Sequence, residues 1–439
     1  MKTRITRNRP GRTISAIASI AVAGIAVSGC TAAGNEDGTT TIVVQQLSQW
    51  TNMMDVVIAE FEEANPDIQV ETQLVSDPNV NTQVIAGNNP PDVAWVPANS
   101  VAYEAALDAD ALLPLDDVWA NQNLDERYGE TTALALKASD GKPYLVSINS
   151  VFYDVVYYNK ALFEEVGAEA PADHRLPDDE ALFEIADLLR AGGYQPLSIN
   201  GKDPAMYGWM VDQLLQNGAD EEQMANYLSN YLPSVEVTAN YTDAPFVDAV
   251  EKVQGWAEAG VFEDGYQGAD EPTATALFLQ GQAGMVLGGS WMPDDIEAAG
   301  IDFGWMLLPG VSDEPVQIPS YRGEAVAVPA GAAHPDEAKR FIEFWMSDDM
   351  QEAAVANTNT ALPAVGTVDA SALDLHEVTQ SIVQDVNEFG GPVGWTSTAP
   401  GSFSQQVVGA NIKLLLLGEL TVEEVALAQQ AALDEIRSQ

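Results

Sequence analysis

The residue types that most often carry catalysis or bind metals are few in this chain and lie far apart. The 439-residue sequence has three histidines, His174, His334 and His376, and one cysteine, Cys30. None of them has the spacing of a metal site, and neither a phosphate-binding glycine loop nor a nucleophile elbow is present. We therefore expect no metal, no cofactor and no enzymatic activity. One alternative stays open, because the 66 acidic residues allow a carboxylate pair of the kind that hydrolyses glycosides.

Cys30 follows a segment with the features of a secretory leader. The first twelve residues carry Lys2, Arg4, Arg7, Arg9 and Arg12, and an apolar stretch over residues 14–27 follows. That stretch has the length of a signal-peptide core and is short for a membrane-spanning helix. Its last residues, Val-Ser-Gly before Cys30, resemble the bacterial lipobox.

The lipobox resemblance implies a signal peptide over residues 1–29 and a diacylglycerol thioether on Cys30. Residues 30–40 are mostly small and polar, as in a flexible tether. We therefore expect a protein anchored by lipid at the cell membrane, on its extracellular face. The alternative is an ordinary leader followed by a chance cysteine, although a lone thiol in a secreted protein needs a reason.

The composition is strongly acidic, with 18 basic against 66 acidic residues and a formal net charge of -48. Such a surface repels phosphate backbones and anionic lipid headgroups, so we expect no nucleic-acid partner and no membrane contact beyond the anchor. After the leader, no apolar stretch is long enough to cross a bilayer. The charge favours solubility and fits a saline habitat, but it does not identify a ligand.

Short apolar strands alternate with amphipathic helices along the rest of the chain. Strands are expected near residues 41–44, 68–72, 92–96, 151–158, 284–287 and 325–328. Helical spacing of apolar residues marks the segments around Met54–Phe61, Leu182–Leu189 and Ala338–Trp345, and Thr421 opens a last helix with a capping box. This alternation is typical of α/β layers. A body of about 400 residues exceeds one comfortable core, so we expect two lobes.

Several phrases then occur in a recognisable order. They are Phe61-Glu62-Glu63-Ala64-Asn65-Pro66, Gly87-Asn88-Asn89-Pro90-Pro91-Asp92, Asp140-Gly141-Lys142-Pro143-Tyr144, Tyr157-Tyr158-Asn159-Lys160, Gly281-Gln282-Ala283-Gly284-Met285, Gly289-Ser290-Trp291 and His334-Pro335-Asp336-Glu337-Ala338. Together they resemble extracellular solute-binding protein family 1, whose best-known member binds maltose and maltodextrins. The resemblance covers nearly the whole chain after the leader.

The resemblance implies an α/β, two-lobed periplasmic-binding-protein-like fold of type II, with a ligand cleft between discontinuous lobes. Lobe 1 is expected over residues 40–148 plus 325–362, and lobe 2 over 149–323 plus 364–439. The implied function is the substrate-binding component of an ABC importer, which captures a sugar outside the cell and delivers it to the permease subunits. We expect a monomer whose lobes close on the ligand.

The family's ligand residues lie at strand ends and helix starts, where a sugar site combines aromatic rings with polar side chains. The candidates at those places are Gln46, Ser48, Trp50, Trp95, Asn99, Asn149, Ser150, Tyr207, Trp209, Gly289, Ser290, Trp291, Arg322, Glu324 and Trp395. Maltose-binding relatives have charged residues after the tryptophan at Trp95, and this chain lacks them. A maltodextrin is therefore disfavoured.

Each candidate also has an ordinary structural interpretation. Trp50 and Trp395 suit core packing as well as ligand contact, whereas Trp256, Trp305 and Trp345 are expected in the core. Arg322 and Glu324 suit a salt bridge as well as a cleft. Gly288-Gly289-Ser290 before a helix also suits an anion site, which would accept a phosphorylated or carboxylated solute.

Overall fold

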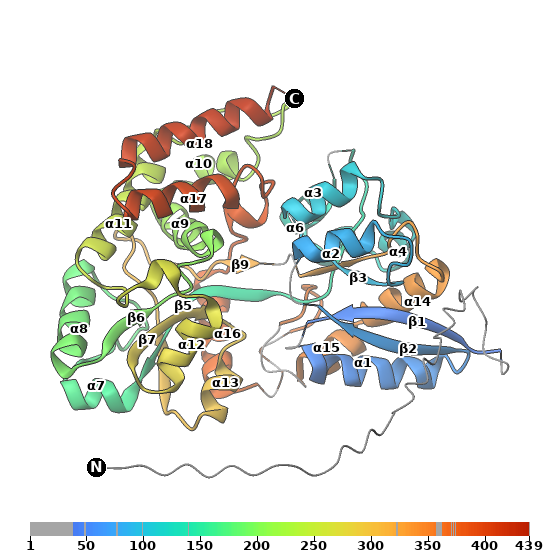
Figure 1. The fold of residues 1–439 in the computed structure, drawn as a ribbon, viewed down its shortest axis with the longest axis horizontal. Coiled ribbons are helices and arrows are strands. Elements are labelled where there is room, and N and C mark those ends of the chain that lie inside the picture. The colour runs from blue at the N-terminus through green and yellow to red at the C-terminus, as the bar shows by residue number, and fades with distance from the viewer. Residues whose placement is uncertain are drawn as a thin grey trace, which may run out of the picture.

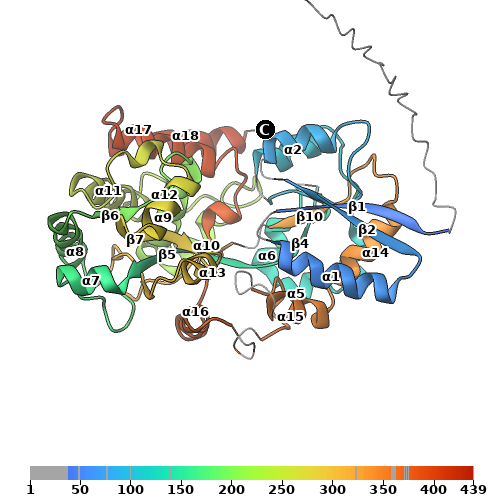
Figure 2. The ribbon, with the colours of Figure 1, turned by 60° about the horizontal axis from the view of Figure 1, so that its bottom comes forward.

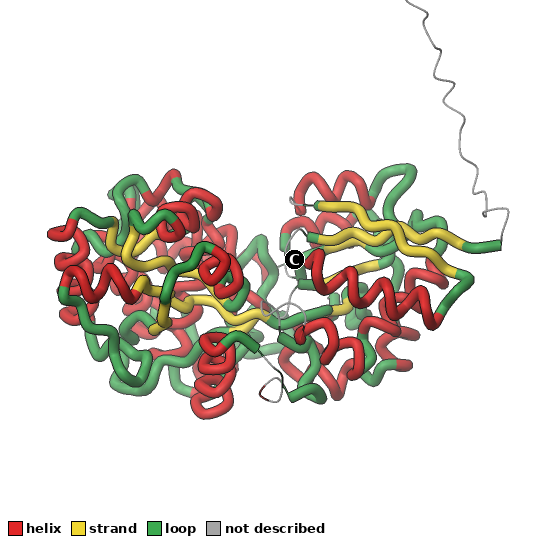
Figure 3. The backbone as a smooth tube through the Cα atoms, turned by 90° about the horizontal axis from the view of Figure 1, so that it is seen from below, coloured by secondary structure: helices red, strands yellow, loops and turns green. Residues whose placement is uncertain are grey.

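The computed structural model describes residues 38–47, 50–75, 78–98, 100–138, 140–321, 324–356, 362–369, 371, 373 and 375–438. Two α/β bodies stand side by side and are joined by a few chain segments between them (Figure 1). The turned views in Figures 2 and 3 show the same two bodies. We call the body that holds β1 to β4 the first lobe and the body that holds β5 to β8 the second lobe.

The first lobe combines two separate segments of the sequence, one before β5 (Val151–Asn159) and one between β9 (Ser320–Tyr321) and α16 (Glu377–Phe389). Its elements are β1 (Thr40–Gln46), α1 (Thr51–Ala64), β2 (Ile68–Leu74), α2 (Pro78–Ile85), β3 (Ala94–Trp95), α3 (Val101–Asp108), α4 (Asp116–Asn121), α5 (Leu124–Tyr128), α6 (Glu130–Leu136), β4 (Val146–Ser147), β10 (Ala325–Ala327), α14 (Pro335–Trp345) and α15 (Asp348–Ala356). β1 and β2 are parallel, and β10 lies between β3 and β4 and is antiparallel to both.

The helices of the first lobe cover its strands with the faces that their spacing predicts. Met54, Val57 and Phe61 of α1 are buried, and Phe61 packs edge-on against Phe341 of α14 at 5.0 Å. α1 ends at Asn65 because Pro66 disfavours helical geometry in the residue before it. The expected buried face of α14 is confirmed.

The third strand is shorter than the sequence predicts. Only Ala94–Trp95 forms β3, and Val93 makes an isolated bridge to Val44. Asp92 lies before the strand, and its carboxylate accepts hydrogen bonds from the backbone N–H of Val43 at 2.9 Å and of His334 at 2.7 Å. The carboxylate thereby ties β1 to the start of α14.

The second lobe is built around a mixed sheet. Its elements are β5 (Val151–Asn159), α7 (Lys160–Val166), α8 (Asp179–Gly192), β6 (Gln195–Ser198), α9 (Pro204–Gly218), α10 (Glu221–Tyr227), α11 (Ala244–Glu258), η2 (Tyr266–Gly268), α12 (Glu271–Leu279), β7 (Ala283–Gly289), α13 (Pro293–Ala298), β8 (Phe303–Met306), β9 (Ser320–Tyr321), α16 (Glu377–Phe389), η4 (Trp395–Ser397), α17 (Gln405–Leu416) and α18 (Val422–Ile436). The strand order is β6-β7-β5-β8, and β9 pairs with the start of β5.

β6 and β7 are parallel, so their carboxyl ends lie at the same edge of the sheet. β5 runs antiparallel to both β7 and β8 and carries an irregularity between Tyr153 and Val155. At that place Asp154 has a φ of 58°, in the left-handed region, and its side chain is buried. The expected capping box of α18 is confirmed, with Thr421 and Glu424 bonded reciprocally.

Within the part of the chain that the structure describes, three segments lead from one lobe towards the other. One leads from β4 into β5, and a second leads from β9 towards β10; the two meet where Val151 pairs with Tyr321. The third lies beside them, because Ser150 and Leu362 exchange two backbone hydrogen bonds of 2.8 and 2.9 Å. Figure 1 shows β5 running from the second lobe towards the first. The residue boundaries given above for the lobes stay a prediction.

Among the described residues, no helix combines the length and the apolar character needed to cross a bilayer. The expected leader and Cys30 lie outside the described residues.

Candidate ligand-binding site

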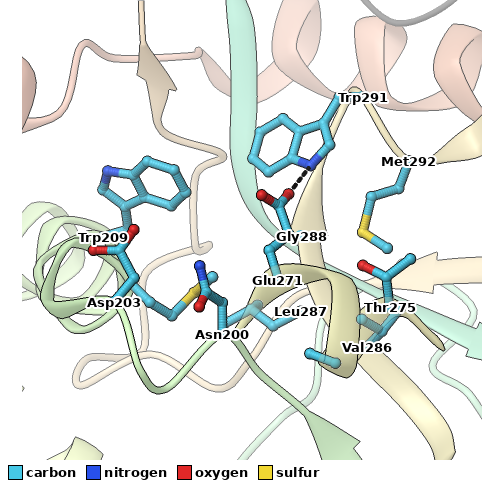
Figure 4. A pocket seen from close by; sticks show the side chains of 12 residues that line it. Asn200, Asp203, Trp209, Glu271, Thr275, Val286, Leu287, Gly288, Trp291 and Met292 are labelled. Carbon is cyan, nitrogen blue, oxygen red and sulfur yellow. Dashed lines mark hydrogen bonds between the residues drawn. The ribbon is translucent and has the colours of Figure 1, made fainter. Parts of the chain in front are cut away.

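A pocket lies in the second lobe at the carboxyl ends of β6 and β7, where α9 and α12 begin. Figure 4 shows side chains from these elements around one space. Its polar and aromatic lining consists of Asn200, Asp203, Trp209, Glu271, Thr275 and Trp291, and its apolar lining includes Met206, Leu287 and Met292. Parallel strands with helices on their faces place ligands outside the carboxyl ends of the strands, so this position is the one that the topology favours.

Two indole rings belong to the lining of the pocket. Trp291 and Trp209 meet edge to face, with ring centroids 6.0 Å apart. Trp209 in turn packs on Tyr153 of β5 at 5.1 Å, which fixes its orientation from behind. Because both tryptophans are partly buried, each is held in place and still has surface left for a ligand.

Two glycines at the end of β7 permit this arrangement. A Cβ on Gly289 would lie 2.0 Å from the Trp291 ring, and a Cβ on Gly288 would lie 2.0 Å from the Met292 sulfur. Any larger residue would push these side chains away from the strand. The glycines therefore let Trp291 and Met292 fold back over the sheet edge and line the pocket.

Two carboxylates lie beside the rings, and both belong to helix starts. Asp203 is the N-cap of α9, and its carboxylate accepts a hydrogen bond from the N–H of Ala205 at 3.0 Å. Glu271 is the first residue of α12 and accepts a hydrogen bond from the Trp291 indole N–H at 3.1 Å. Burial raises the pKa of Glu271, the bond from Trp291 lowers it, and the negative charge of Asp203 raises it further.

The first lobe holds another pairing of a tryptophan with an acid, outside the lining of this pocket, and Trp95 is buried, with an exposed fraction of 6%. The Trp95 indole N–H donates to Glu324 Oε2 at 2.8 Å. Burial raises the pKa of Glu324 to about 7, against the lowering effect of the Trp95 bond. The backbone of Trp95 is held by buried amides, since Gln45 Oε1 accepts from its N–H at 3.1 Å and Asn81 Nδ2 donates to its carbonyl at 2.7 Å. This network fixes the ring at the end of β3.

Three expected ligand residues lie at the end of β1 and between β4 and β5. Gln46, Asn149 and Ser150 are all buried, with exposed fractions of 5, 3 and 4%. Gln46 Oε1 and Asn149 Oδ1 have no hydrogen-bond partner among the described residues. Ser150 is engaged through its backbone with Leu362.

Three expected ligand aromatics lie in the cores instead. Tyr207 is fully buried and donates its hydroxyl to the Gly201 carbonyl at 2.9 Å. Trp395 is fully buried in an aromatic cluster with Tyr241, and Trp50 packs edge-on against Trp345 at 6.4 Å. These side chains therefore offer no surface to a ligand in this conformation. The cores also contain Trp256, Trp305 and Trp345, as expected.

The expected anion site before α13 is already engaged by the chain. The N–H of Ser290 donates to the Phe152 carbonyl at 2.9 Å, and Ser290 Oγ accepts from the Phe152 N–H at 3.2 Å. Gly289 is paired with Tyr153 in the sheet, and its carbonyl accepts from the Tyr157 hydroxyl at 2.8 Å. The helix that follows has only six residues. Nothing in this geometry favours a phosphorylated or carboxylated solute.

The remaining expected residues, Ser48, Asn99 and Arg322, lie outside the described residues. Sequence reasoning missed Asn200, Asp203, Glu271 and Thr275, which line the pocket. A local signal existed for two of them, because Asp203-Pro204 and Glu271-Pro272 mark helix starts. Within the part of the chain that the structure describes, no three His, Cys, Asp or Glu side chains gather as a metal site would require.

Comparison with known proteins places the chain in a family. The family model of the bacterial extracellular solute-binding proteins matches residues 47–352. An uncharacterised ABC transporter extracellular-binding protein of Pyrococcus horikoshii is 25% identical over 396 residues, which are 83% of this chain and 82% of that protein. The xylose/arabinose-binding protein XacG of Haloferax volcanii is 23% identical over 332 residues, or 72% of this chain and 67% of that protein.

Solved structures agree in fold. A chitin oligosaccharide binding protein superposes with a TM-score of 0.71 at 18% identity, over 91% of this chain and 100% of the other. An ABC transporter solute-binding protein of Thermotoga lettingae, bound with α-D-tagatose, also gives 0.71, at 19% identity and with the same coverage. The expected two-lobed α/β fold of type II is thus confirmed. The chain belongs to the family of bacterial extracellular solute-binding proteins.

Proposed function

We propose that this protein is the substrate-binding component of an ABC importer, which captures a carbohydrate outside the cell and delivers it to the permease subunits. The observation that carries the proposal is the pocket of the second lobe, where two indole rings face carboxylate and amide groups. Sugar rings have apolar C–H faces that pack on aromatic rings. Their hydroxyls donate to carboxylates and exchange hydrogen bonds with amides. The pocket offers both kinds of contact.

Relatives support a carbohydrate as the ligand. One relative is described as binding xylose or arabinose, one structural neighbour as binding chitin oligosaccharides, and another holds tagatose. These ligands differ in size and stereochemistry, so they favour a sugar in general and no particular one. We keep the sugar's identity open.

Our proposed mechanism is closure of the two lobes on the sugar. Trp209, Trp291, Asp203 and Glu271 would hold it from the second lobe, and the Trp95–Glu324 pair would contact it from the first. A ligand that touches both lobes stabilises the closed form by its difference in affinity for the two forms. The closed form, as a monomer without a cofactor, would then dock on the permease.

A thermal-shift screen over a panel of sugars tests this proposal. A true ligand raises the apparent melting temperature by mass action, and the rise grows with ligand concentration. No shift with any mono- or oligosaccharide would overturn the carbohydrate assignment. The same mixtures should be analysed for released sugar, because hydrolysis of an oligosaccharide would favour the glycoside hydrolase alternative.

The proposed lipid anchor needs its own test. Cys30→Ser should leave sugar binding intact and release the protein from the membrane fraction, since the thioether would no longer form. Continued sedimentation with membranes would refute the anchor.

A further inference from the structure

The pocket of the second lobe has an unbalanced charge. Two carboxylates, Asp203 and Glu271, belong to its lining, and no Lys, Arg or His does so among the described residues. The nearest basic residue in the sequence is Lys202, whose ammonium pairs with Asp270 at 3.3 Å and is largely exposed. The pocket therefore gains no cation from this lysine.

The two carboxylates occupy the places where an anionic ligand would otherwise dock. Asp203 caps α9, a helix of 15 residues, and Glu271 is the first residue of α12. The N-terminal ends of helices favour negative charge, so both positions suit an acidic side chain. An anionic solute would have to approach these charges within a protein whose net charge is -48.

The negative charge of Asp203 also disfavours the ionised form of Glu271. Burial is the main cause that raises the pKa of Glu271, and the charge of Asp203 raises it further. A hydroxyl of a neutral sugar would donate one hydrogen bond and leave both negative charges in place. An ammonium group would donate three hydrogen bonds and cancel one charge.

The aromatic wall points to the same ligand class through independent geometry. The rings of Trp209 and Trp291 meet at 63°, and Trp291 is fixed on the Glu271 carboxylate by its indole N–H. In Figure 4, Trp291 and Glu271 lie together on one side of the pocket, and Trp209 and Asp203 lie together on the other. Tryptophan faces attract cations, most strongly where water is excluded. Each side of the pocket thus combines a carboxylate with an indole ring.

We propose that the captured sugar carries a free, protonated amino group, which lies between Asp203 and Glu271 and against the two indole rings. This inference rests on the proposed carbohydrate-binding function and narrows its ligand class to amino sugars. In this arrangement the sugar ring packs on Trp291 while its ammonium group binds the acid pair.

The test compares three sugars that differ at one substituent: D-glucosamine, N-acetyl-D-glucosamine and D-glucose, together with their β-1,4-linked dimers. Calorimetry is run at pH 6.0, where the free amine is protonated. The amine form should bind at least tenfold more tightly than the acetylated and hydroxyl forms of the same length. Raising the salt concentration should weaken the amine form more than the other two.

Two variants locate the effect. Asp203→Asn and Glu271→Gln keep hydrogen-bonding side chains of the same shape, and asparagine still caps a helix. Each should remove most of the preference for the amine while the protein stays folded by circular dichroism. Asp302→Asn is the matched control, because it removes one exposed carboxylate whose partner is Lys160, outside the pocket lining. It should leave the preference unchanged.

The outcomes separate this proposal from the function on which it rests. Equal or tighter binding of the glucose or N-acetyl series would overturn the amino-sugar assignment and leave carbohydrate binding standing. An amine preference that survives both pocket variants would also overturn it. If no sugar of any series binds and the wider panel also fails, the carbohydrate function itself falls.

Discussion

Replacing Trp291 by alanine is the sharpest test of the pocket. The indole lines the pocket, meets Trp209 edge to face and donates to Glu271 at 3.1 Å. Alanine removes the surface on which a sugar ring would pack, and it also frees the Glu271 carboxylate to move. Aromatic residues at the centre of an interface typically contribute 2 kcal/mol or more, so affinity for the best sugar of the panel should fall about 30-fold or more.

A second substitution separates the two contributions of the indole. Trp291→Phe keeps an aromatic face and loses the N–H that holds Glu271, together with part of the area of the indole. A hydrogen bond to a charged group contributes about 1.5–3 kcal/mol when buried and less at a partly exposed position. We therefore expect a loss of roughly fivefold for phenylalanine, intermediate between the wild type and alanine.

The assay is isothermal titration calorimetry, with circular dichroism as a check on folding. Tyr194→Phe is the control, since Tyr194 stands directly before β6, at the end away from the pocket, and its hydroxyl donates to Glu165 at 2.9 Å. Its affinity should equal that of the wild type. A folded Trp291→Ala protein that binds with unchanged affinity would refute the placement of the sugar in this pocket.

Three further predictions concern stability and closure. Burial raises the pKa of Glu263 to about 7, so its protonated carboxyl stabilises the fold below the unfolded pKa near 4.5, and this contribution of about 3 kcal/mol at most is lost as the pH rises through 7. Glu263→Gln should therefore flatten the fall in melting temperature between pH 5 and 7.5, and an unchanged slope would contradict this cause. Because the net charge is -48, sodium chloride should raise the melting temperature between 0.05 and 1 M by screening repulsion, and a constant or falling value would contradict that reasoning. The Glu104 carboxylate of α3 accepts a hydrogen bond from the Ser402 N–H, before α17, at 3.2 Å and so joins the two lobes. Glu104→Ala should shift the ligand-free protein towards more open forms, with a larger radius of gyration by small-angle scattering. An identical radius would show that the contact has no effect on closure.

Local patterns predicted much of the fold because they depend on short-range physics. The apolar spacing of α1 and α14 gave their buried faces, and the proline after Asn65 gave the end of α1. The capping box at Thr421 marked the start of α18. β3 was predicted too long, because the role of Asp92 depends on Val43 and His334, which are distant in the sequence.

The aromatic candidates show where position along the chain stops being informative. Tyr207 and Trp209 stand two residues apart on α9, yet Tyr207 is fully buried and Trp209 lines the pocket. Residues i and i+2 of a helix are about 200° apart around its axis, so aromatics at this spacing face nearly opposite sides. Which side is the core depends on the helices packed against α9, among them α17 and α11, and that packing cannot be read from the segment itself.

The acid pair of the pocket was missed for a related reason. In the sequence, Asp203 and Glu271 resemble ordinary helix-start residues, 68 positions apart, and each has a local explanation in capping or the helix dipole. They come together because β6 and β7 are parallel neighbours, with Leu197 opposite Met285. The chain enters α9 after β6, and α12 leads into β7. A substitution that removes either charge should therefore change the ligand preference of the pocket more than the stability of its helix. Measuring both quantities on Asp203→Asn isolates the role of the charge, because asparagine keeps the helix cap.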